Sequence, residues 1–370
     1  MNTARPSRRL GFVLLLLGIS LNAIGQSWSF TGSMNQARVY PAAALLPDGQ
    51  VLIVGGYHRG LTVSVAELYN PSTGAFTTTG SLNTPRYGAS ATLLNNGKVL
   101  IAGGASGNAT TELYDPSTGK FTVGASESCA CGAEPTLLAN GMVLFSGGFN
   151  GSTAIATAEL YNPATGTFSP TGNLVVARAG ASSTLLPNGK VLVAGGVYYT
   201  GTPPYNLVAH YLASAELYDP TTGTFTLTGS LNTARSSNTA TVLDNGDVLL
   251  AGGQNDGANG GYLASSELYN PSTGKFTLTG SLNTARILHT AHLLATGEVL
   301  IVAGNYHGSL GTSELYNPST GRFSYGPSLN TPRQGHASAL LPNGQVLAAG
   351  GYDSALGSYA GYLASAELFH

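Results

Sequence analysis

The chain of 370 residues repeats one segment seven times. Each copy reads Glu-Leu-Tyr-Asn-Pro-Ser-Thr-Gly or a close variant, and the seventh comprises only Glu-Leu-Phe-His. Successive copies begin 45, 47, 57, 51, 47 and 53 residues apart. A period near fifty is typical of propellers and solenoids, whose units bury their apolar faces against their neighbours. The copies begin at Glu67, Glu112, Glu159, Glu216, Glu267, Glu314 and Glu367.

The unit from residue 40 to residue 86 predicts four short antiparallel strands. A Pro-Asp-Gly turn follows the first strand, because glycine accepts the positive φ of a tight hairpin. The second strand is a continuous apolar run that ends at a diglycine, as expected of a strand buried on both faces. An Asn-Pro-Ser-Thr-Gly turn joins the third strand to the fourth. The expected strands are 40–46, 50–54, 66–69 and 75–79.

These features resemble kelch repeats, particularly those of the galactose oxidase propeller. The resemblance rests on the diglycine, the Tyr-Asn/Asp-Pro turn, an aromatic residue in the fourth strand and an arginine after it. It covers residues 26–370 and implies an all-β, seven-bladed kelch β-propeller with four antiparallel strands per blade. The fourth-strand aromatics are Phe76, Phe121, Phe168, Phe225, Phe276 and Phe323.

The two ends of the chain are complementary parts of one unit. Trp28 is in register with Phe76, so the mature N-terminus reads as a fourth strand without the first three. Residues 367–370 read as a third strand without a fourth. We therefore expect the N-terminal strand to complete the C-terminal blade and close the ring, which leaves no free sheet edge between the ends.

Residues 1–25 predict a signal peptide. Arg5, Arg8 and Arg9 precede an apolar run at 10–19, and Ala-Ile-Gly at 23–25 provides a small-x-small cleavage site. The prediction is a secreted or periplasmic protein, with residues 26–370 as its propeller domain and no membrane span after cleavage. An uncleaved anchor and twin-arginine export through Ser-Arg-Arg at 7–9 are the alternatives.

Charge excludes nucleic acid as an expected partner. Removal of the leader leaves twelve Lys and Arg against seventeen Asp and Glu, a net charge of −5, and no basic tract. Phosphate contacts require clustered cations, which the mature chain lacks. Two cysteines are too few for a disulfide scaffold, so stability is expected to come from stacked sheets.

The repeated glutamates and six repeated arginines admit two interpretations. A ring of arginines could hold an anion, as the matching kelch arginine contacts partners in some members of the family. Alternatively, each blade repeats a structural hydrogen-bonding device. Repetition favours the structural interpretation, because a site normally needs different groups in different blades. The arginines are Arg38, Arg86, Arg178, Arg235, Arg286 and Arg333.

Blade three lacks this arginine and has Cys129-Ala130-Cys131 in its place. A Cys-x-Cys disulfide would close a small, strained and easily reduced ring. A soft-metal site would need further ligands, and the neighbouring sequence offers only Glu127 and Glu134. The pattern favours two thiols, buried or oxidised, without a catalytic part.

Histidines are scattered along the chain. His289 and His292 are three apart on an expected strand, so they point to opposite faces and cannot share a metal ion. Polar residues on blades six, seven and one form an arc. The arc predicts either a polar pocket or weak metal site, or residues that only fill the loops, and the second interpretation is favoured. This arc contains Tyr306, His307, Tyr352, Asp353, Tyr57, His58, His289 and His336.

The loop between the second and third strands varies most, from 7 to 19 residues. It emerges on the face that also carries the arginine connection, and function on rigid scaffolds concentrates in such loops. Ten of the nineteen tyrosines lie there, and tyrosine offers flat, amphipathic contact area at low entropic cost. In the two longest loops, tyrosines are expected to stack on a ligand, and His210 and Asp353 to donate or accept hydrogen bonds. The predicted ligand-binding residues are Tyr198, Tyr199, Tyr205, His210, Tyr211, Tyr352, Asp353 and Tyr359.

The favoured function is a secreted, non-catalytic recognition module for a glycan or a protein, without a cofactor. One alternative is a copper radical oxidase of the galactose oxidase kind. The resemblance implies two Tyr, two His and a Cys crosslinked to one Tyr at the copper, and a further C-terminal domain that brings a ligand. The paired cysteines of blade three and the end of the chain in blade seven argue against copper. The other alternative is an envelope scaffold. No hydrolase or phosphate-binding motif occurs.

Overall fold

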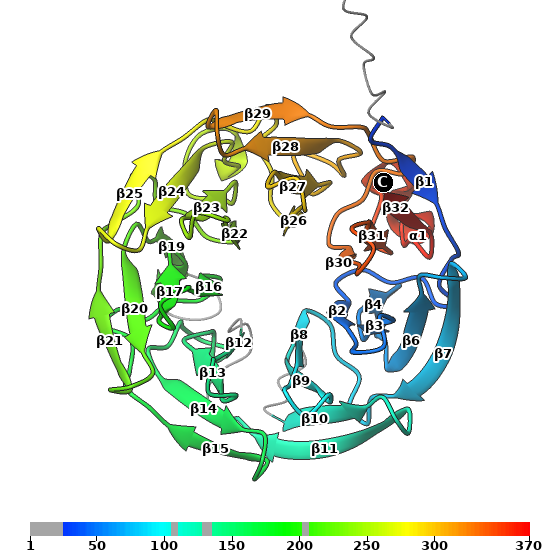
Figure 1. Cartoon of the computed structure of the whole chain (residues 1–370), viewed down its shortest axis with the longest axis horizontal. Helices are drawn as coiled ribbons and strands as arrows, with labels where there is room; N and C mark the ends of the chain where they lie inside the picture. Colours follow the sequence, from blue (N-terminus) through cyan, green and yellow to red (C-terminus); the bar gives the residue numbers. More distant parts are fainter. Residues whose placement is uncertain (1–24, 105–109, 128–134, 202–206) are drawn as a thin grey trace, which may run out of the picture.

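The computed structural model describes residues 25–104, 110–127, 135–201 and 207–370. Seven four-stranded antiparallel sheets surround a central axis as the blades of a propeller (Figure 1). This confirms the predicted fold class. The signal-peptide prediction and both cysteines lie outside the described residues. Within the described ranges, no helix is both long and apolar enough to span a bilayer.

In blades 1 to 4, the chain runs outward from the first strand, near the axis, to the fourth, at the rim. Blade 1 consists of β2 (Ala42–Leu45), β3 (Val51–Val54), β6 (Val65–Asn70) and β7 (Ala75–Ser81), and blade 2 of β8 (Ala89–Leu93), β9 (Val99–Gly103), β10 (Thr110–Asp115) and β11 (Lys120–Ser126). Blade 3 consists of β12 (Thr136–Leu137), β13 (Val143–Ser146), β14 (Ala158–Asn162) and β15 (Thr167–Pro170), and blade 4 of β16 (Ser182–Leu185), β17 (Val191–Ala194), β20 (Ala215–Asp219) and β21 (Thr224–Leu227).

Blades 5 to 7 follow the same plan. Blade 5 consists of β22 (Thr239–Val242), β23 (Val248–Ala251), β24 (Ser266–Asn270) and β25 (Lys275–Leu278), and blade 6 of β26 (Thr290–Leu293), β27 (Val299–Val302), β28 (Ser313–Asn317) and β29 (Arg322–Tyr325). Blade 7 consists of β30 (Ala337–Leu340), β31 (Val346–Ala349), β32 (Ala366–Phe369) and β1 (Trp28–Phe30). The loops between second and third strands add β4 (Tyr57–His58), β5 (Leu61–Thr62), β18 (Val197–Thr200), β19 (Val208–Tyr211), η1 (Asn259–Gly261), η2 (Ser354–Leu356) and α1 (Gly357–Ala360).

The N-terminal strand closes the ring, as the sequence predicts. β1 pairs with β32 in antiparallel register, with Trp28 opposite Phe369. Their ring centroids are 5.5 Å apart. Blade 7 is therefore made from both ends of the chain, and its sheet order is β1-β32-β31-β30.

The apolar core lies between adjacent blades. The second strands are buried, apart from Gly103 at the end of β9, because each packs against the sheets on both sides; Val51–Val54 is an example. The residues on one face of a blade join those of the next in a shared cluster, such as Val51 and Ile53 of blade 1 with Leu347 of blade 7. Seven such clusters hold the ring together. The blades thus form one rigid scaffold from which the loops project.

Candidate functional site

The repeated arginines form buried ion pairs. Arg38 donates from Nη2 to Oε1 of Glu67 at 2.7 Å, and both side chains are fully buried. The Arg38 Nη1 also donates to the carbonyl oxygens of Gly55 and Val65. The same pairing, at 2.5 to 3.4 Å, occurs in Arg86–Glu112, Arg178–Glu216, Arg235–Glu267, Arg286–Glu314 and Arg333–Glu367.

Each glutamate of these six pairs also fixes the connection that enters its blade. Glu67 accepts the backbone N–H groups of Asn35 and Gln36 at 2.7 and 3.1 Å. A charge buried without partners would be costly, and here the carboxylate is fully hydrogen-bonded. The structural interpretation of the repeated Glu and Arg is therefore confirmed. The anion-binding interpretation is wrong, because these guanidinium groups are buried and occupied by protein acceptors.

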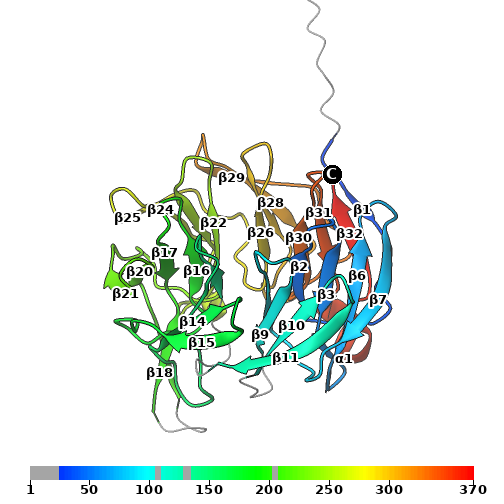
Figure 2. The same ribbon diagram turned by 60° about the horizontal axis from the view of Figure 1, so that its bottom comes forward.

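The loops that join the second strand of a blade to its third strand gather on one face of the ring. In Figure 2, β18 of blade 4 and α1 of blade 7 both lie along the lower edge of the propeller. The opposite face carries tight turns with shallow grooves of about 400 Å³ between neighbouring blades. Polar and small side chains line these grooves, such as Asp48, Asn96 and Lys98 in one of them. The aromatic loop residues distinguish the first face as the candidate site.

Six aromatic side chains from blades 7, 1 and 2 form a continuous group, which we name the aromatic cluster. Tyr362 is at its centre, with centroid distances of 5.1 Å to His58, 5.2 Å to Tyr352 and 6.2 Å to Tyr57. Tyr57 in turn lies 5.3 Å from Tyr87. All of these side chains are only partly buried. The cluster consists of Tyr40, Tyr57, His58, Tyr87, Tyr352 and Tyr362.

An unusual backbone conformation presents Tyr40 to the cluster. Tyr40 has φ of 54°, in the left-handed region that favours glycine, and glycine stands at the equivalent positions Gly88 and Gly335. The Tyr40 N–H donates to the Gly335 carbonyl at 2.7 Å, and the Gly88 N–H donates to the Tyr40 carbonyl at 2.9 Å. These bonds join three neighbouring blades. They hold the Tyr40 ring 6.5 Å from that of Tyr87.

Electrostatics keeps the cluster neutral. Burial raises the pKa of Tyr40, and the neighbouring Tyr87 and Tyr362 raise it further. Burial, with Tyr57 and Tyr352, also raises the pKa of Tyr362. Burial and the adjacent Arg59 lower the pKa of His58. At neutral pH, Tyr40 and Tyr362 therefore offer phenol hydroxyls and His58 an uncharged imidazole, all able to exchange hydrogen bonds with a ligand.

The three predicted residues of blade 7 have three different roles. Tyr352 belongs to the aromatic cluster. Asp353 is 5% exposed, and its carboxylate accepts the N–H of Ala355 and so caps η2. Tyr359 on α1 is 75% exposed, and its carbonyl accepts a hydrogen bond from Arg59 Nε at 3.0 Å. Tyr359 is thus a free surface ring beside the cluster.

The predicted residues of blade 4 form a separate group on the β18–β19 hairpin. Tyr198 stacks on His210 at a centroid distance of 4.8 Å. Tyr199 packs edge-on against Phe149 of blade 3, and His210 bonds the hydroxyl of Thr200. Burial raises the pKa of Tyr211. Tyr205 lies outside the described residues.

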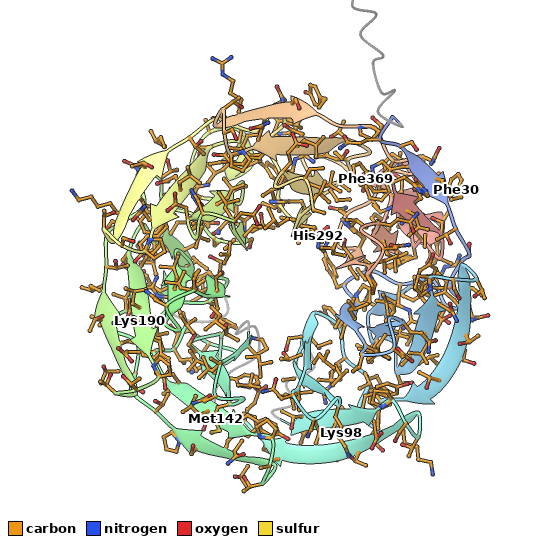
Figure 3. All side chains as sticks on the ribbon, in the orientation of Figure 1. Phe30, Lys98, Met142, Lys190, His292 and Phe369 are labelled. Carbon is orange, nitrogen blue, oxygen red and sulfur yellow. The ribbon has the colours of Figure 1, made fainter. Side chains whose placement is uncertain are left out.

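Three further histidines link neighbouring blades. His289 bonds Thr239 of blade 5, and His336 bonds Thr290 of blade 6, each at 3.1 Å. His292, labelled in Figure 3, bonds Ser338 of blade 7 at 2.6 Å. Burial lowers the pKa of His289 to about 3 and that of His292 to about 4. These neutral imidazoles are inter-blade hydrogen-bonding groups.

The donor set does not match the copper centre that the kelch resemblance implies. That centre needs two imidazoles with two phenols, whereas the aromatic cluster contributes one imidazole, from His58. Within the described residues, no three His, Cys, Asp or Glu side chains lie close enough together to hold a metal ion. The aromatic cluster therefore lacks the second imidazole of such a centre.

The sequence predicts half of the aromatic cluster. The predicted arc of polar residues contains Tyr57, His58 and Tyr352, whereas no sequence pattern singles out Tyr40, Tyr87 or Tyr362. The available signal for Tyr40 and Tyr87 was their position immediately after the repeated arginine, at Arg38 plus two and Arg86 plus one. In a closed ring, blades 7, 1 and 2 are neighbours, which brings these positions together.

No family model and no curated protein matches the chain. Its structure is similar to that of a fungal alcohol oxidase of the AA5 family, solved in complex with copper. The TM-score is 0.75 at 19% sequence identity, over 93% of this chain and 76% of the oxidase. This similarity supports the propeller fold.

Proposed function

We propose that the protein is a recognition module that binds a glycan at the aromatic cluster. The observation that carries the proposal is the continuity of six half-buried aromatic rings across three blades. Phenol rings stack on the apolar faces of sugars, and their hydroxyls bond the sugar hydroxyls. The rings sit on a scaffold of buried ion pairs, so their arrangement is set before the ligand arrives, which lowers the entropic cost of binding.

A glycan suits this surface better than a protein partner. The cluster is uncharged at neutral pH, and only 9% of the residues in the chain are charged. It combines flat rings with hydroxyl and imidazole groups at short spacing, which matches a ligand that alternates apolar ring faces with hydroxyl groups.

A copper-dependent alcohol oxidase is the second candidate. The similarity to the AA5 enzyme favours it more directly than it favours a non-catalytic module. Against it stands the donor set of the aromatic cluster, which has one imidazole where two are needed. Two Tyr-His dipeptides, at 57–58 and 306–307, are the positions at which a copper site would first be sought.

A glycan array without added metal tests the first candidate. We expect selective binding that Tyr362→Ala weakens, because Tyr362 contacts three other rings of the cluster. Tyr325→Ala is the matched control, since Tyr325 is 59% exposed on the outer strand β29. No binding to any glycan, or binding unaffected by Tyr362→Ala, overturns the proposal.

Copper loading tests the second candidate on the same protein. After incubation with Cu²⁺ and gel filtration, metal content and peroxide release with galactose and simple primary alcohols are measured. We expect less than stoichiometric copper and no peroxide. One copper per chain with peroxide release, both lost in His58→Ala or His307→Ala, would establish the oxidase instead.

A further inference from the structure

A second aromatic group lies two blades from the cluster, at the junction of blades 5 and 6. Tyr262 of blade 5 contacts Tyr306 of blade 6 at 5.6 Å and 80°, and His307 at 5.1 Å and 67°. Tyr306 and His307 are themselves 4.7 Å apart. The three rings thus form a compact group on the loops of two neighbouring blades.

This group repeats the central part of the aromatic cluster position by position. Tyr262 and Tyr362 begin identical Tyr-Leu-Ala-Ser segments before the third strand. Tyr306 lies two residues after Gly304, and His58 lies two residues after Gly56. Each of these glycines is the second residue after the second strand of its blade. Tyr362 meets His58 edge-on at 5.1 Å and 61°, as Tyr262 meets Tyr306. Two blade junctions therefore carry the same edge-to-face pair.

The turn beside each pair is also the same. Arg59 and His307 occupy equivalent positions and have φ of 48° and 53°, each followed by a glycine. Residues other than glycine are uncommon in this left-handed region, and such strained positions concentrate at binding sites. Both side chains are exposed, and each places a hydrogen-bond donor next to an edge-to-face aromatic pair.

Each group lies beside solvent-exposed side chains of the loops that form it. The Arg59 Nε bonds the Tyr359 carbonyl, and Tyr359 itself is 75% exposed. At the other junction His307 is exposed, and Tyr262 and Tyr306 are partly buried. At the junction of blades 4 and 5, which the structure describes, this pairing is replaced: Gln254 and Asn255 follow the diglycine of blade 5, where blade 1 has Tyr57 and His58.

We infer that the propeller has two equivalent sugar subsites, centred on Tyr362 and Tyr262, and that its ligand is a polysaccharide long enough to occupy both. This inference rests on the proposed glycan-binding function. In a seven-fold ring, two blades correspond to a rotation of about 100° around the axis. Occupation of both subsites by one polymer makes the second contact intramolecular, so the polymer binds more tightly than its fragments.

The experiment compares polymers with their own fragments by calorimetry. The probes are a β-1,4-glucan, a β-1,4-mannan, a xylan and a polygalacturonate, each paired with its tetrasaccharide. For the probe that binds, we expect two tetrasaccharides per chain and a polymer affinity at least tenfold higher per site. Tyr262→Ala and Tyr362→Ala should each reduce the tetrasaccharide stoichiometry to one and remove the tenfold gain.

Control variants keep the outcomes distinct. Tyr325→Ala should leave stoichiometry and affinity unchanged, and unaltered melting temperatures exclude misfolding. One tetrasaccharide per chain, lost in Tyr362→Ala and intact in Tyr262→Ala, overturns the second subsite and leaves the proposed function standing. Failure of all four polymers to bind overturns the two-subsite inference, and failure of every glycan on the array as well overturns the proposed function.

Discussion

Glu127 occupies, between blades 2 and 3, the position that Leu82 occupies between blades 1 and 2. Each follows the last serine of a fourth strand, Ser126 or Ser81, in equivalent register. Glu127 is 4% exposed and Leu82 is 5% exposed. The Leu82 side chain lies against Gly55, whereas the Glu127 carboxylate accepts a hydrogen bond from the backbone of Gly103. A carboxyl group thus stands where the other junctions bury an apolar side chain.

This carboxyl group predicts a pH-dependent stability. Burial, with a smaller contribution from Glu159, raises the pKa of Glu127 to about 8, against the partial opposition of Arg86. In the unfolded chain the pKa is about 4.3. The folded state therefore binds more protons between these values, and the free energy of unfolding falls as pH rises from about 4.3 to 8. The loss approaches about 5 kcal/mol as an upper bound.

Glu127→Leu tests this origin, because it restores the residue that most other junctions use. The variant should be more stable than the parent at pH 8 and lose most of the pH dependence in this range. Urea midpoints measured from pH 5 to 9 provide the comparison, and Glu127→Gln separates charge from shape. Parallel pH profiles for parent and Glu127→Leu would show that another group is responsible.

The buried ion pairs predict large losses on substitution. Arg286→Leu leaves Glu314 buried without its cation, and breaking such a pair costs about 3–5 kcal/mol. Guanidinium-induced unfolding should record this loss. Lys275→Leu, an exposed cation on the rim strand β25, is the control and should change stability by less than about 0.5 kcal/mol. A loss below about 1 kcal/mol for Arg286→Leu would contradict the structural role of the pair.

The repeated tyrosines provide a matched pair of variants. Tyr269 bonds Thr228 of the preceding blade at 3.0 Å, and Tyr269→Phe should cost about 1 kcal/mol. The equivalent Tyr161 hydroxyl has no partner among the described residues, because Gly124 stands where most other blades have the threonine. Tyr161→Phe should therefore be neutral or slightly stabilising. Equal losses in the two variants, measured by thermal unfolding, would refute this assignment.

Closure of the ring depends on the inward face of β1. Trp28 is 7% exposed and packs on Phe369, so Trp28→Ala should cost about 3–5 kcal/mol. Phe30 on the same strand is 60% exposed, and Phe30→Ala should cost less than about 0.5 kcal/mol. Hydrogen exchange of β32 amides should rise in the first variant alone. If Trp28→Ala left both stability and exchange unchanged, β1 would not be holding the ring closed.

Most of the fold followed from periodicity. Seven copies of one segment specify seven similar units, and each unit has the turn residues and apolar run of a four-stranded sheet. The incomplete first and last units predicted the pairing of β1 with β32, which the structure confirms. The structural role of Arg38 and its equivalents followed from repetition, since identical groups in successive blades indicate a common packing device.

The sites on the loop face followed far less directly. The sequence placed the binding residues in the two longest loops, but ring contacts group Tyr198 with His210 on one hairpin and Tyr352 with Tyr362 elsewhere. The blade 4 and blade 7 residues therefore belong to two groups, and their part in ligand binding stays a prediction. Loop length indicated which face of the propeller carries the aromatic residues, but not which of these residues form the aromatic cluster.

The sequence by itself determined the number of blades, the strands of each blade and the way in which the ring closes, because these depend on local turn chemistry and on a pattern repeated along the chain. Only the tertiary structure decided which aromatic residues meet. Tyr40, Tyr87 and Tyr362 are separated by up to 322 positions, and they come together because closure makes blades 7, 1 and 2 neighbours. The left-handed turns at Tyr40, Arg59 and His307 then set the direction of each side chain, which no periodic pattern encodes.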